Sequence, residues 1–61
     1  MERWKQEAKG ILDEFARRGA RFVEPTDIPE EIRARLDAIC MESVGRMVME
    51  VELEEFLSSL G

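Results

Sequence analysis

The middle of the chain predicts a helix that is apolar on two nearly opposite faces, and this pattern constrains the fold more than any other feature. Successive side chains of a helix are separated by about 100°. From Pro29 onward, this spacing gathers larger residues on one face: Ile32, Leu36, Ile39, Cys40, Ser43 and Met47. The other face carries mainly small residues: Ala34, Ala38, Met41, Gly45 and Val48. Because apolar helix faces are normally buried, we expect a cover on both sides.

Two arrangements satisfy this requirement. In the first, the preceding helix covers one face and the following helix covers the other, so the chain needs no partner. In the second, both neighbouring helices pack on the Ile/Leu face. The face with Ala34 and Ala38 is then left for a second copy of the chain or for another protein. Small residues four positions apart let another backbone come close. The sequence leaves both arrangements open.

The segment before the two-faced helix is predicted to be a helix and a loop. Residues 2–18 carry an apolar stripe that begins at Trp4, with charged residues on the opposite side. Gly19 follows this stripe, and glycine is the residue that most often ends a helix. Residues 19–28 are predicted to form the loop that leads to the next helix.

The second and third helices are predicted over about residues 29–46 and 50–60. Asp27 followed by Glu30 resembles a capping box, which favours a helix start near Pro29. The sequence therefore predicts an all-α fold, a single small helical domain over residues 1–61 with three helices in a compact arrangement. A short extended segment near residues 20–24 or 47–51 is a variant of this prediction.

The residue types exclude several classes of site. Cys40 is the only cysteine in 61 residues and there is no histidine. Neither an internal disulfide nor a zinc site of the usual nitrogen and sulfur ligands can therefore form within one chain. Nucleophile–histidine catalysis is absent for the same reason. We expect a protein that is not an enzyme and has no catalytic residues, no metal site and no cofactor, with Cys40 filling the core.

The charge distribution favours a protein partner over nucleic acid. The chain carries nine basic and 14 acidic side chains, for a formal charge of −5. This acidic balance opposes binding to phosphate backbones, so a helix-turn-helix nucleic-acid binder remains an unfavoured alternative. No apolar run is long enough to span a membrane, and the first residues lack the apolar core of a signal peptide. We expect a cytoplasmic protein that does not bind membranes.

A contact surface is the function that these observations favour. We predict a non-catalytic module for protein–protein interaction or self-association, whose partner is another protein or a second copy of the chain. The predicted partner-binding residues combine the small-residue face with the tryptophan, a residue type enriched in interfaces. They are Trp4, Ala34, Ala38, Met41 and Gly45.

The N-terminal spacing resembles that of a known family. Trp4, Glu7, Ala8 and Leu12 match a Trp-x-x-Glu-Ala-x-x-x-Leu pattern. This pattern opens the small C-terminal domain found in one of the subunits of light-independent protochlorophyllide reductase and in its stand-alone relatives. Later positions also look similar: Pro29, Ile32-Arg33, Glu42 with Gly45, and Val48-Met49. The resemblance implies a small helical module, and an alternative function as an accessory domain of that reductase or another redox enzyme. No catalytic residue of the reductase maps onto this chain.

Overall fold

The computed structural model describes residues 2–60 and confirms the predicted three-helix, all-α fold. Residues 20–24 and 47–51, the two possible extended segments, form no strand, and residues 2–60 contain no strand elsewhere. None of the helices in this part of the chain is long and apolar enough to span a membrane. The elements are α1 (Arg3–Arg17), the 3-10 turn η1 (Pro25–Asp27), α2 (Glu30–Val44) and α3 (Glu50–Ser58).

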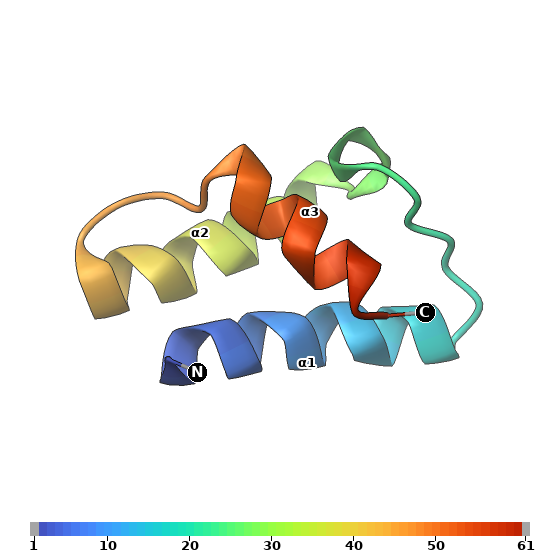
Figure 1. Cartoon of the computed structure of the whole chain (residues 1–61), viewed down its shortest axis with the longest axis horizontal. Coiled ribbons are helices and arrows are strands. Elements are labelled where there is room, and N and C mark those ends of the chain that lie inside the picture. Colours follow the sequence, from blue (N-terminus) through green and yellow to red (C-terminus); the bar gives the residue numbers. More distant parts are fainter. Residues whose placement is uncertain (1, 61) are drawn as a thin grey trace.

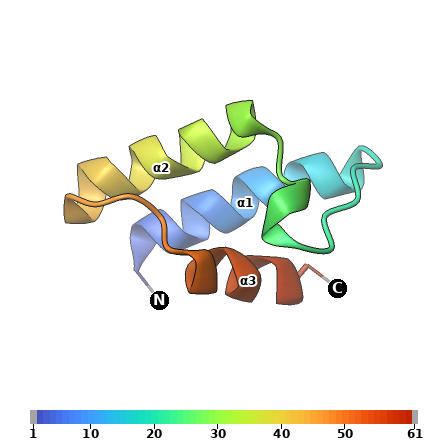
Figure 2. The same ribbon diagram turned by 90° about the horizontal axis from the view of Figure 1, so that it is seen from above.

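Helix α1 is the base on which the other two helices pack. α2 and α3 lie above it in Figure 1, and the view from above in Figure 2 shows them on either side of its axis. α1 and α2 run in opposite directions, whereas α3 runs in the same general direction as α1. The turn η1 packs against α3. The described chain measures 31 × 22 × 19 Å.

The core lies where the apolar stripes of the three helices meet. The stripe of α1 contributes Trp4, Ala8 and Leu12, all of which are at most 2% exposed. Burial of these side chains supplies the main favourable free energy of folding. The remaining buried apolar residues come from the later elements: Ile28, Ile32, Leu36, Cys40, Val48, Leu53, Phe56 and Leu57.

The structure leaves open the same face of the two-faced helix as the second arrangement does, but α3 packs against α1 and the turn η1 and not directly on α2. On α2, Leu36 and Cys40 are completely buried. Ala34 and Ala38 are exposed on the other side of the same helix. The chain thus leaves the small-residue face of α2 uncovered.

The structure corrects the predicted end of the second helix and the predicted positions of Met47 and Val48. The helix stops at Val44, because Gly45 adopts a left-handed conformation (φ 74°) and its N–H donates to Met41 O at 2.9 Å. This geometry is typical of a helix-ending glycine. Beyond it the helical spacing no longer applies. Met47, predicted on the Ile/Leu face, is therefore 61% exposed, and Val48, predicted on the small-residue face, is 6% exposed.

The predicted capping box at the start of α2 is also wrong. Asp27 caps the preceding turn instead, because its Oδ2 accepts the N–H groups of Val23 and Glu24 at 3.0 and 2.9 Å. These two hydrogen bonds, that from Glu24 foremost, lower the pKa of Asp27. Pro29 occupies the N-cap position of α2 and provides no side-chain cap. The short side chain of Asp27 thus accepts hydrogen bonds from the nearby backbone N–H groups of the loop and not from those of α2.

Candidate interaction surface

The exposed side of α2 forms an apolar face bordered by charged residues. Ala34, Ala38 and Met41 define this outer face, and Met41 is 49% exposed. One flank of the face opens into a groove of about 510 Å³, to which Met47 contributes from the following loop. The full lining of this groove, called the α2 groove below, is Glu30, Arg33, Ala34, Asp37, Ala38, Met41 and Met47.

The loop that carries Met47 is tied to α2 at two points. The backbone N–H of Val48 donates to Asp37 Oδ1 at 3.0 Å. Arg33 Nη2 lies 3.6 Å from Glu50 Oε2, at the start of α3. The Arg33–Glu50 ion pair is exposed to solvent, which weakens it, so the hydrogen bond between Val48 and Asp37 holds the loop more effectively. Both contacts hold the loop against α2 and thereby fix the wall of the α2 groove.

An ion pair between the half-exposed Arg46 and the buried Glu52 anchors the same loop from the core side. Arg46 donates through Nη1 and Nη2 to the two carboxylate oxygens of Glu52, both at 2.8 Å. Glu52 is only 4% exposed, and its Oε1 also accepts the N–H of Met49 at 2.9 Å. Charge-assisted, bidentate pairs of this kind have fixed geometry. The hydrogen bonds from Arg46, followed by that from Met49, lower the pKa of Glu52 to about 2.

Trp4, predicted to bind a partner, belongs to this anchor and to the core and lies apart from the outer face of α2. Its ring is 2% exposed and packs edge-to-face on Phe56, with centroids 6.0 Å apart and planes at 82°. The guanidinium of Arg46 lies 5.8 Å from the ring centroid. The indole N–H donates to Glu2. A side chain held in this way by folding has almost no surface left for a partner.

Cys40 lies in the core beneath the loop. Its side chain is completely buried, and Arg46 Nη1 lies 3.8 Å from its Sγ. Burial raises the pKa of the thiol, and the nearby positive charge of Arg46 only partly opposes this shift. The thiolate is the reactive form of cysteine. Cys40 thus has the environment of a core residue rather than that of a nucleophile.

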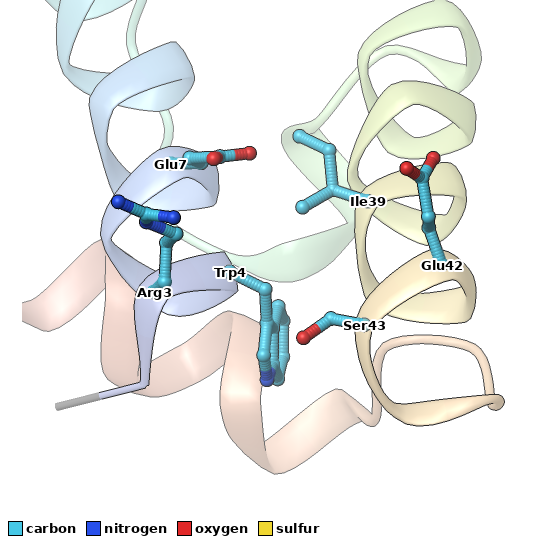
Figure 3. A pocket seen from close by; sticks show the side chains of 6 residues that line it. All are labelled: Arg3, Trp4, Glu7, Ile39, Glu42 and Ser43. Atoms are coloured by element: carbon cyan, nitrogen blue, oxygen red, sulfur yellow. The ribbon is translucent and has the colours of Figure 1, made fainter.

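A smaller hollow of about 250 Å³ lies between α1 and α2 at the Trp4 end of the molecule. Figure 3 shows Ile39 and Ser43 directed from α2 toward α1, with the ring of Trp4 beside Ser43. Charged residues form its margin: Arg3, Glu7 and Glu42. The chain contains no imidazole that could activate the hydroxyl of Ser43. The described residues also contain no cluster of three or more His, Cys, Asp or Glu side chains that could hold a metal ion.

The structure brings together three of the five predicted partner-binding residues. Ala34, Ala38 and Met41 share the outer face of α2, whereas Trp4 is buried. Gly45 is exposed, but it ends the helix and does not continue the face. Sequence reasoning missed Met47 as a lining residue. The signal that could have found it is Gly45 itself, since a glycine after an apolar helical stripe commonly marks the end of the helix.

Comparisons of the chain with protein-family models, curated proteins and solved structures found no match. The resemblance to the reductase domain therefore stays a prediction, as does the helix-turn-helix alternative.

Proposed function

We propose that this chain is a non-catalytic interaction module that binds a helix of another polypeptide through the outer face of α2. The supporting observation is the exposure of this face. The apolar stripe on the inner side of α2 is buried in the core, whereas Ala34, Ala38 and Met41 are exposed. Exposed apolar surface bordered by polar groups is typical of interaction sites.

The size of the side chains indicates a helix as the binding partner. Ala34 and Ala38 are four residues apart and project little from the backbone, so they leave a shallow hollow along the helix. A second helix can lie in such a hollow with its axis about 8–10 Å from that of α2. Met41 supplies a flexible apolar side chain at the edge of the hollow, and methionine adapts well to a partner surface.

Charge supports a protein partner over nucleic acid. The border of the α2 groove includes the carboxylates of Glu30 and Asp37 beside the single cation Arg33. A phosphate backbone would be repelled by this border. We also propose a cytoplasmic location, which the free and buried Cys40 supports because free thiols persist in a reducing compartment.

The proposal is tested by placing a photo-crosslinking residue, benzoylphenylalanine, at position 41 in cells of the source organism. We expect a discrete covalent adduct whose second polypeptide is identified by mass spectrometry. Ala38→Glu should abolish the adduct, because it places a charge in the middle of the apolar face. The matched control is Gln6→Glu, which makes the same change of charge at an exposed position of α1.

The contradicting result is equally specific. If position 41 gives no discrete adduct, or if the adduct persists undiminished in Ala38→Glu, the outer face of α2 is not the interaction surface. Circular dichroism of the purified variants shows whether each retains the helical fold of the unsubstituted chain.

A further inference from the structure

The outer face of α2 has small side chains at one end and the large side chain of Met41 at the other. In two antiparallel copies, the large side chain of each copy would lie against the small side chains of the other. Ala34 and Ala38 lie on the N-terminal side of the point between positions 38 and 39, and Met41 lies on its C-terminal side. When two such helices run antiparallel, the C-terminal half of one lies against the N-terminal half of the other. A register centred between positions 38 and 39 sets Met41 of each copy between Ala34 and Ala38 of the other. The large side chain thus fills the space that the small ones leave.

Charged residues at the border of the face satisfy the same register. Arg35 and Glu42 lie on one edge of the outer face, next to Ala38, and both are exposed. Within residues 2–60 neither of them forms an ion pair. A two-fold axis between antiparallel helices brings the same edge of both copies together. In this register, facing residue numbers add up to 77, so Arg35 of one copy faces Glu42 of the other, twice.

The charged residues on the opposite edge of the face already have partners within the chain. Asp37 already accepts the N–H of Val48, and Arg33 already lies beside Glu50. A parallel pair, by contrast, would set Met41 against Met41 and Ala34 against Ala34, so that one end would be crowded and the other would be left with a gap. Apolar size and charge therefore favour the same antiparallel arrangement independently.

We infer that the polypeptide which covers the outer face of α2 is a second copy of this chain, bound antiparallel with reciprocal Arg35–Glu42 ion pairs. The inference rests on the proposed function and names its partner. A stable interface commonly buries about 800 Å² on each partner. This would be nearly a fifth of the 4286 Å² of accessible surface of the described chain, and one helix face provides less. We therefore expect a weak dimer, with a Kd of about 10–100 μM.

Charge reversal tests the inference directly. Arg35→Glu turns both ion pairs into Glu–Glu contacts, and Glu42→Arg turns both into Arg–Arg contacts. Each variant alone should dimerise at least about tenfold more weakly than the unsubstituted chain at low ionic strength. A mixture of the two variants restores both attractive pairs, so it should form a heterodimer with an affinity near that of the original dimer. Sedimentation equilibrium measures the affinities, and native mass spectrometry identifies the heterodimer by its mass.

Matched controls separate this effect from that of net charge. Arg21→Glu and Glu54→Arg make the same changes of charge at exposed positions away from α2, and they should leave the affinity unchanged. A chain that stays monomeric up to about 500 μM overturns the inference. A dimer that is insensitive to both reversals, or a mixture that does not recover, overturns it as well. In each of these cases the crosslink from position 41 still decides the proposed function, because an adduct with a different protein supports that function without the dimer.

Discussion

The substitution Glu52→Gln should weaken the fold by removing the charge that Arg46 binds. Glutamine preserves the shape of the side chain and can still accept a hydrogen bond from the N–H of Met49. The loss of unfolding free energy therefore reports on the ion pair. The pKa of Glu52 is lowered from 4.5 to about 2, which corresponds to about 3 kcal/mol. The side chain of Arg46 is 41% exposed, and screening by solvent reduces the expected loss to about 2 kcal/mol.

This loss is large for so short a chain. Typical stabilities of about 0.05–0.15 kcal/mol per residue give about 3–9 kcal/mol for 61 residues. The assay is urea unfolding, followed by the fluorescence of Trp4 and by circular dichroism at 222 nm. Trp4 is the only tryptophan, and because it is buried, its emission reports on exposure of the core. The control is Glu54→Gln, an exposed position on the same helix, where we expect a change below about 0.5 kcal/mol.

The pH dependence provides the refuting result. Because the pKa of Glu52 is lower in the folded than in the unfolded chain, its stabilisation is fully present above pH 4.5. It is lost progressively as the pH falls toward 2. The difference between Glu52→Gln and the unsubstituted chain should therefore shrink to less than half between pH 7 and pH 3. Equal stabilities at pH 7, or a difference that does not decrease at pH 3, would show that the ion pair does not stabilise the fold in this way.

Two further substitutions and one chemical probe test the remaining structural conclusions. Gly45→Ala should lower the free energy of unfolding by about 1 kcal/mol, because φ is 74° there. Gly10→Ala should raise the free energy of unfolding by a similar amount, because Gly10 lies inside α1 with open space around the added methyl group. Urea midpoints that move in the same direction for both variants would contradict this reasoning. The thiol of Cys40 should react with Ellman's reagent at least about a hundredfold faster in urea than in the native protein, because it is buried and its pKa is raised. Similar rates in both conditions would place Cys40 outside the core.

Local pattern was sufficient to predict the three helices and most of their buried stripes. Trp4 and Leu12 in α1, and Leu36 in α2, recur at helical spacing and are all buried. Such spacing places side chains on one face whatever the rest of the chain does, because the helix geometry is local. The same logic failed after Gly45. There one residue with positive φ ends the helix, so helical spacing does not determine the positions of Met47 and Val48.

Trp4 shows a second limit of sequence reasoning. An aromatic residue at the start of a helical stripe suits both a core and an interface, because both environments are apolar. The difference depends on residues that are distant in sequence: Phe56 packs against its edge and Arg46 lies over its ring. The Arg46–Glu52 pair that completes this cluster has no signature in the sequence, since the two residues come together only when the loop between α2 and α3 is folded.

The sequence by itself determined that α2 has two apolar faces and that neither a disulfide nor a zinc site within the chain can stabilise the fold. Only the tertiary structure decided which face is buried. α1 and α3 both contribute to a core on the Ile/Leu side, where Leu36 and Cys40 are completely buried, and Ala34 and Ala38 remain in contact with solvent. The physical reason is that burial depends on how much apolar surface each packing arrangement removes from water. The larger side chains offer more of that surface than alanine does, so α2 packs with the Ile/Leu side toward α1 and the shared core.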